Sequence, residues 1–141
     1  MEITMDQITV PAKTEQLDRV QEFVTEHLEC HDCSMKVMMQ IEIAVEEIFV
    51  NIANYAYQPE SGETTIGCEV SGDPLTVVIQ FTDRGRPFDP LVKEDADTSR
   101  DALIEREGGL GILMVKKSMD EVGYAYENGS NILTITKKLE E

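Results

Sequence analysis

The stretch LTVVIQFTDRGRPFDP, residues 75–90, decides the fold because it joins an apolar strand to a polar turn. Apolar side chains recur at every second position from Leu75 to Thr82, which predicts a half-buried β-strand. One face of this strand is apolar, formed by Leu75, Val77, Ile79 and Phe81. The polar turn therefore begins where a buried strand ends.

The turn that follows, Asp83 to Pro90, carries groups that suit a flat polar ring. Asp83 at a strand end can accept a hydrogen bond from an exocyclic amine. Gly85 would let the backbone approach such a ring closely. Asp, Gly and Pro are also the usual residues of an ordinary polar turn. Taken alone, the motif leaves both interpretations open.

A long helix precedes this strand in the sequence. Ser34 is the expected N-cap, and the helix is predicted to run to about Tyr57 and to stop at Pro59. Two sides of it are apolar: Ile41, Val45, Ile48 and Ile52 share one face, and Ile43 and Val50 lie nearly opposite. We therefore expect the helix to be covered on two sides.

Three polar residues fall in the gap between those faces. Glu47, Asn51 and Asn54 lie within roughly 60° of one another around the helix. They face either solvent, as a simple solvated stripe, or a ligand.

A glycine cluster opens a later helix. EGGLGI, residues 107–112, would free backbone N–H groups at a helix N-terminus to hold phosphate. No strand precedes it, so it is not a Rossmann fingerprint, and no Gly-Lys-Ser/Thr follows, so it is not a Walker A loop. A flexible hinge is the alternative.

The remaining patterns complete a single domain over residues 1–141. Asn128-Gly129 and Gly72-Asp73-Pro74 indicate hairpins. The order of elements predicts a two-layer α/β (α+β) sandwich, with a mixed, mostly antiparallel sheet and helices on one face. The other predicted elements are strands at Ile3–Val10, Glu63–Ser71, Val122–Tyr126 and Ile132–Lys138, and helices at Lys13–Glu29 and Gly109–Glu121.

The charge balance excludes several classes of function. The 141 residues include 28 acidic and 12 basic side chains, a formal net charge of −16. This charge argues against binding a nucleic-acid backbone or an anionic lipid surface. No run approaches the ~20 apolar residues that span a bilayer.

The three cysteines fit a reducing cytoplasm, the expected compartment. Cys30 and Cys33 crowd with His27 and His31 and lack the two-knuckle spacing of a zinc site. A redox C-x-x-C would follow a strand, whereas this pair follows a helical stretch. The pattern favours thiols at a turn between two helices.

In their order, these motifs resemble the ATP-binding domain of the gyrase, histidine-kinase and MutL superfamily. The order is a helical Glu-x-x-x-Asn, then Asp-x-Gly-x-Pro-Phe-Asp after a strand, then an acidic loop, then Gly-Gly-Leu-Gly opening a helix. More narrowly, the chain looks like the stand-alone bacterial anti-sigma-factor serine kinases of the RsbW type. The resemblance covers Ile41 to about Leu139.

The resemblance implies a role for each matching residue. Glu47 would be the general base that activates a serine hydroxyl or a water. Asn51 would be the Mg²⁺ ligand. Asp83 would bind the adenine amino group, and Gly109 and Gly111 would present amides to the phosphates. The other expected ATP-binding residues are Asn54, Gly85, Pro87, Phe88, Arg106 near the γ-phosphate, Gly108, Leu110, and Thr134 near the base ring.

Residues 86–107 would form the lid over ATP. A base, a metal ion and a closing lid suffice in outline for phosphoryl transfer. Two features of this sequence differ from the pattern of the family. Tyr55 stands where several relatives carry His, and the lid is acidic and poor in arginine, which implies weaker closure on a triphosphate.

The implied function is a Mg-ATP-dependent serine-protein kinase that phosphorylates a STAS-type anti-anti-sigma antagonist and sequesters a sigma factor. One alternative is a non-catalytic, nucleotide-gated protein-binding module. Another is an adaptor that has kept the fold but lost the nucleotide. Homodimers occur in the family, although no stretch shows a readable dimer seam.

Overall fold

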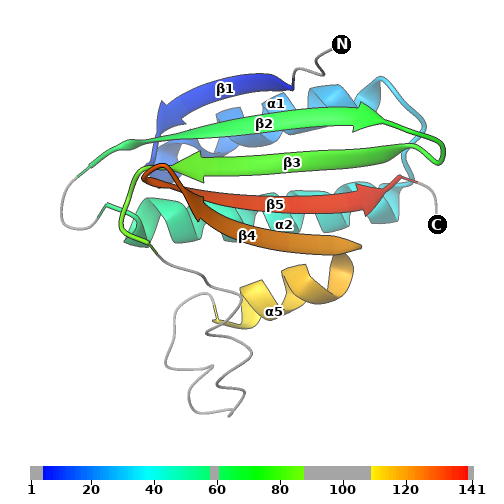
Figure 1. Ribbon diagram of the computed structural model, residues 1–141. Coiled ribbons are helices and arrows are strands. Elements are labelled where there is room, and N and C mark those ends of the chain that lie inside the picture. The colour runs from blue at the N-terminus through cyan, green and yellow to red at the C-terminus, as the bar shows by residue number, and fades with distance from the viewer. Residues whose placement is uncertain (1–4, 58–60, 88–108, 140–141) are drawn as a thin grey trace.

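A single antiparallel sheet forms one layer of the protein. A computed structural model describes residues 5–57, 61–87 and 109–139. The strands lie in the order β1-β2-β3-β5-β4, and each neighbouring pair is antiparallel. Their bounds are β1 (Asp6–Pro11), β2 (Glu63–Ser71), β3 (Thr76–Asp83), β4 (Glu121–Glu127) and β5 (Ser130–Lys138) (Figure 1).

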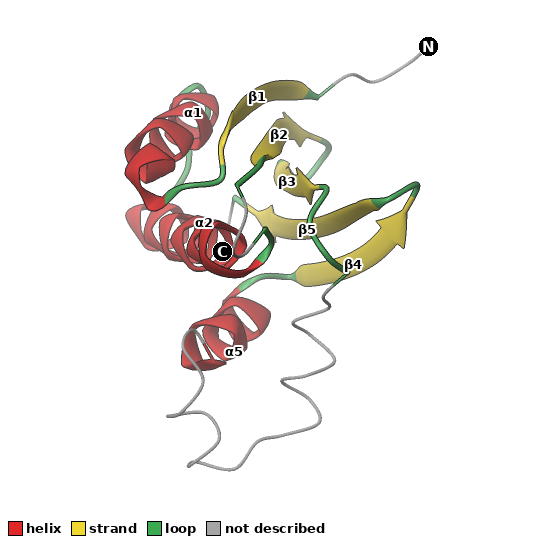
Figure 2. Cartoon of the chain, turned by 90° about the vertical axis from the view of Figure 1, so that its left-hand side faces the viewer, coloured by secondary structure: helices red, strands yellow, loops and turns green. Residues whose placement is uncertain are grey.

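Helices form the second layer and cover one face of this sheet (Figure 2). They are α1 (Leu17–Glu29), α2 (Met35–Tyr55) and α5 (Gly109–Ser118), and a short 3₁₀ turn at Thr14–Gln16 precedes α1. Helix α2 packs against both α1 and α5. The largest fully buried side chains include Phe49 and Ile48 of α2 and Phe81 and Ile79 of β3. The predicted two-layer α/β sandwich is confirmed.

Helix α2 begins at the predicted cap. The Ser34 hydroxyl accepts a hydrogen bond from the Val37 N–H at 3.1 Å, which satisfies one of the free donors of the first turn. The helix ends at Tyr55 rather than Tyr57. Pro59, the predicted stop, lies outside the described residues.

Both predicted hairpins are present. Asn128 and Gly129 join β4 to β5 with φ angles of 52° and 79°, the left-handed backbone that a tight hairpin turn requires. Gly72, with φ 90°, lies in the turn between β2 and β3. These turns set the β2–β3 and β4–β5 registers, while Asp83 lies opposite Asn131 in the separate pairing of β3 with β5.

The predicted end of α5 is wrong. The helix was expected to reach Glu121 but stops at Ser118, and β4 begins at Glu121. The Asp120 N–H donates to the Thr136 carbonyl at 2.9 Å, and its carboxylate accepts from the Lys138 N–H. Pairing with β5 therefore takes the chain out of the helix early.

The expectation that α2 is covered on two sides is also wrong. The face that carries Ile41 and Ile48 is buried, but Ile43 remains 43% exposed and Met39 54% exposed. In the described part of the chain, α1 and α5 flank α2 without covering this outer face (Figure 2).

Candidate functional site

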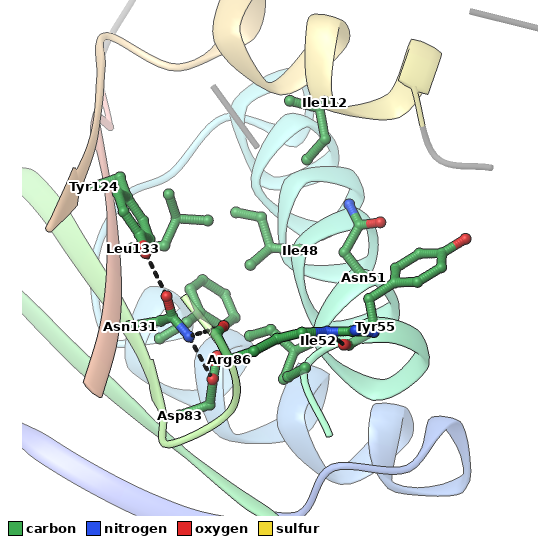
Figure 3. Close-up of a pocket in the computed structure, with 12 residues that line it drawn as sticks. Ile48, Asn51, Ile52, Tyr55, Asp83, Arg86, Ile112, Tyr124, Asn131 and Leu133 are labelled. Atoms are coloured by element: carbon green, nitrogen blue, oxygen red, sulfur yellow. Dashed lines mark hydrogen bonds between the residues drawn. The ribbon is translucent and has the colours of Figure 1, made fainter. Parts of the chain in front are cut away.

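A pocket opens where the end of β3 meets the C-terminal half of α2 and the start of α5 (Figure 3). Its walls are mainly apolar, with polar groups gathered beside the strand ends. The lining residues are Ile48, Asn51, Ile52, Tyr55, Ala56, Phe81, Asp83, Arg86, Ile112, Tyr124, Asn131 and Leu133. An apolar cavity with a few convergent polar groups is the usual form of a small-molecule site.

Asp83 is the buried acid of this pocket. It lies at the end of β3 and is only 6% exposed. Its Oδ1 accepts hydrogen bonds from the Gly85 N–H at 2.9 Å and from Asn131 Nδ2 at 3.0 Å. Within the described residues, both hydrogen bonds of the Asp83 side chain fall on Oδ1. Oδ2 can therefore accept from a ligand.

Asn131 holds Asp83 in place and was not singled out from the sequence. It stands opposite Asp83 in the β3–β5 ladder. Its Nδ2 also donates to the Arg86 carbonyl at 2.9 Å, and the Tyr124 hydroxyl donates to its Oδ1. Because this amide is 7% exposed and fully engaged, it fixes both the carboxylate and the turn after it. No local pattern pairs it with Asp83, because the β3–β5 register joins residues 48 positions apart.

Gly85 lies against the C-terminal end of α2. A Cβ at this position would overlap the backbone carbonyl of Ala56 at the end of α2. The next residue, Arg86, donates from its N–H to the Ala56 carbonyl at 3.1 Å and from Nε to the Tyr55 carbonyl at 3.2 Å. The turn after β3 is thus joined to the C-terminus of α2.

Tyr57 makes a second connection to the same turn. Its hydroxyl accepts from the Arg84 N–H at 2.7 Å and donates to the Glu63 carbonyl at 2.6 Å. Burial and nearby acidic groups raise the pKa of this phenol, and the Arg84 N–H acts in the opposite direction. The phenol therefore stays protonated and continues to donate at neutral pH.

The polar residues predicted on α2 do not all reach the pocket. Asn51 lines it, and so does Tyr55. Glu47 lies one turn earlier, half-buried and outside the lining set. Burial, and secondarily the charge of Glu46, raises the pKa of the Glu47 carboxyl. Asn54 is half-buried on the same helix and is not part of the pocket wall.

The glycine cluster forms the first turn of α5. Gly109, Leu110 and Gly111 begin the helix, and Ile112 in the same turn lines the pocket. This end of α5, as far as the structure describes it, lies beside the pocket. Pro87 is exposed at the start of the expected lid. Phe88, Arg106, Gly108 and most of the predicted lid lie outside the described residues.

The prediction that Thr134 lies near the base ring is wrong. Side chains along β5 point to the two faces of the sheet in turn. Those of Leu133 and Ile135 are buried against the helices, so the Thr134 side chain points to the other face. Its hydroxyl accepts from Gln80 Nε2 at 3.3 Å, on the opposite face of the sheet from the pocket.

The residues present fit a magnesium ion held mainly by a ligand. Among the residues that the structure describes, no group of three or more His, Cys, Asp or Glu side chains could hold a metal ion. Mg²⁺ usually keeps several waters and needs only one or two protein oxygens in addition to phosphate. The Asn51 amide, which reaches the pocket wall, would supply such an oxygen.

The sequence matches a known protein family over most of its length. A family model described as a histidine kinase-like ATPase domain matches residues 10–137. The chain belongs to this family. The predicted resemblance to its RsbW-type members is also confirmed, since curated relatives carry that name.

Two of these histidine kinase-like ATPase relatives illustrate the likeness. The serine-protein kinase RsbW of Listeria monocytogenes serovar 1/2a is 30% identical over 77% of this chain and 70% of its own length. That of Halalkalibacterium halodurans is 28% identical over 95% of this chain and 83% of its own length. These names support an ATP-binding, kinase-type role.

A solved structure shows the same fold. The RsbU and RsbW domains of Rv1364c from Mycobacterium tuberculosis match 99% of this chain with a TM-score of 0.69 and 18% identity. This chain spans only 33% of that protein. Within the residues described here, no helix of this family member is both long and apolar enough to cross a membrane.

Proposed function

We propose that the chain is a Mg-ATP-dependent serine-protein kinase of the RsbW type. It would phosphorylate a STAS-type anti-anti-sigma protein and sequester a sigma factor when that antagonist is absent. The names of the curated relatives support the kinase activity. Because ATP is kept in the cytoplasm and the three cysteines are free thiols, the proposal places the protein there.

The observation that carries the proposal is the buried Asp83 with one oxygen held and the other available. Asn131 and the Gly85 N–H orient the carboxylate through Oδ1. Oδ2 can then accept from the exocyclic amine of adenine, while Phe81, Ile52 and Leu133 contact the ring. A buried acceptor placed in this way discriminates strongly against a base that lacks the amine.

The phosphates would lie between Asn51 and the first turn of α5. Backbone N–H groups at Gly109 to Gly111 bind phosphate oxygens there. Asn51 would hold Mg²⁺, which would neutralise phosphate charge. Glu47 accepts the proton of the attacking serine hydroxyl, a role suited to a carboxyl with a raised pKa.

Nucleotide binding is tested first. A fluorescent ATP analogue with Mg²⁺ is titrated against wild type, Asp83→Asn and the control Asp73→Asn, whose residue is exposed in the β2–β3 turn. Loss of one charged acceptor weakens binding about 10-fold to 100-fold in Asp83→Asn. Equal affinities for all three proteins would refute the adenine assignment.

Phosphoryl transfer is tested next, with γ-labelled ATP and a purified STAS-domain protein. We expect Glu47→Gln to bind nucleotide but to transfer about 100-fold to 10,000-fold more slowly. Glu22→Gln, an exposed helical glutamate on α1, is the matched control. Wild-type transfer by Glu47→Gln would remove Glu47 as the base. Nucleotide-dependent partner binding without transfer by wild type would instead favour the non-catalytic module.

A further inference from the structure

A row of apolar side chains is exposed on the N-terminal half of α2. Met35, Met39 and Ile43 recur every fourth residue and therefore lie along one side of the helix. They are 79%, 54% and 43% exposed. These three residues, here called the outer α2 stripe, extend about 12 Å along the helix axis.

The stripe lies apart from the nucleotide pocket. The pocket uses α2 residues from Ile48 to Tyr55, towards the C-terminal end of the helix. Met39 and Asn51 are about 18 Å apart along the axis at 1.5 Å per residue. The two surfaces can therefore be altered separately.

Acidic groups border the stripe. On a helical projection, Glu42 and Glu46 fall within roughly 60° of Met39. Glu46 is exposed and Glu42 half-exposed, and neither carboxylate forms a salt bridge within the described ranges. An apolar row with two acids along one border suits a partner surface that carries apolar and basic groups.

The charge also argues against two other occupants. A second copy of the chain would bring its own acidic row and a net charge of −16 to the interface. An anionic lipid surface would be repelled in the same way. A basic helix of another protein has neither difficulty, and its apolar side chains at i, i+4 and i+8 would match the stripe.

We propose that the outer α2 stripe, with Glu42 and Glu46, is a docking surface for an amphipathic helix of a partner protein whose apolar face is edged by Lys and Arg. Methionine suits this use because its side chain adapts to the shape of its partner. None of the five residues of this surface lines the pocket.

The probe is a labelled 18-residue peptide of Leu and Lys designed as an amphipathic helix. Its binding to the full chain is followed by fluorescence anisotropy, with a scrambled peptide of the same composition as reference. We expect saturable binding of the helical peptide, weakened at least about tenfold by Met39→Asp. Met114→Asp, an equally exposed methionine on α5, is the matched control and should bind like wild type.

A charge comparison separates local from overall attraction. Glu42→Lys/Glu46→Lys and the control Glu121→Lys/Glu127→Lys raise the net charge equally, and only the first pair should weaken binding. Equal effects of the two pairs, equal binding of the scrambled peptide, or unchanged affinity in Met39→Asp would overturn the proposal. Sedimentation that shows a wild-type dimer dispersed by Met39→Asp would assign the surface to a second copy and overturn it as well. Circular dichroism melts confirm that each variant is folded.

Discussion

Asn131 Nδ2 donates a hydrogen bond to Asp83 Oδ1 at 3.0 Å, from directly across the β3–β5 ladder. The amide comes from the strand that enters the sheet last along the chain, and the acid from the strand in its centre. The position of the carboxylate therefore depends on strand register as well as on the turn that contains it.

Replacement of Asn131 tests this dependence. Asn131→Ala leaves the buried Asp83 carboxylate with one fewer donor, and we expect a loss of about 1–3 kcal/mol in the free energy of unfolding. Nucleotide affinity should fall as well, because the carboxylate is no longer oriented. The control is Gln80→Ala, which removes a hydrogen bond on the other face of the sheet. Unchanged nucleotide affinity with a lower melting temperature would make Asn131 purely structural.

Gly85 gives a second prediction, read from urea unfolding. In Gly85→Ala, the new methyl group overlaps the Ala56 carbonyl, so the turn or the end of α2 must shift. We expect destabilisation of about 1–3 kcal/mol, as for overpacking in a core. Gly123→Ala is the matched control, because a Cβ at Gly123 would have no neighbouring atom within 4 Å. Equal midpoints for the two variants would contradict the close contact described here.

The acid limb of the activity profile gives a third prediction. Burial and the Glu46 charge raise the pKa of the Glu47 carboxyl. If Glu47 is the base, phosphoryl transfer slows as the pH falls through that raised pKa, because the carboxylate becomes protonated. Glu46→Gln removes the neighbouring charge and should move the acid limb of kcat to lower pH. The measurement is phosphoryl transfer as a function of pH, with Glu22→Gln as control. A limb that stays in place would show that a group other than Glu47 titrates.

His27 predicts a pH-dependent contribution to stability. Burial acts to lower its pKa, but the hydrogen bond to the Phe23 carbonyl and the contact with Asp6 outweigh it and raise the pKa. With Nδ1–H donated to Phe23 at 2.8 Å, Nε2 needs a proton to face the Asp6 carboxylate at 2.9 Å.

A raised folded-state pKa stabilises the fold below the unfolded pKa, and the gain is lost as the pH rises through the folded value. The free energy of unfolding should therefore be higher for wild type than for His27→Gln. This difference should be larger at about pH 5.5 than at about pH 8. Chemical denaturation at both pH values measures the difference. A stability difference between the two proteins that is larger at the higher pH would contradict a raised pKa for His27.

Local patterns predicted most of the elements. The bounds of β2, the Ser34 cap and the Asn128-Gly129 hairpin all follow from signals within a few residues. The family motifs also placed Asn51 and Asp83, which the structure brings to one pocket. The strand bounds, the cap and the hairpin need only the short-range preferences of the chain.

The predictions from sequence were wrong where contacts between distant segments determine the structure. Ile132 to Ile135 reads as a nearly continuous apolar run, so its period does not say which residues face the helices, and a one-residue change of register exchanges them. Thr134 was therefore assigned to the wrong face, and Asn131 was missed. The end of α5 was misplaced because Asp120 pairs with Thr136, a contact that no local pattern contains.

The position of β5 has a consequence for synthesis on the ribosome. This strand follows the other described strands in the sequence, yet it lies between β3 and β4. A nascent chain that has emerged only as far as Asp83 presents β3 as an unpaired edge with an apolar face. That edge stays open until residues 130–138 leave the exit tunnel, so the growing chain is exposed to aggregation during the interval between the two strands.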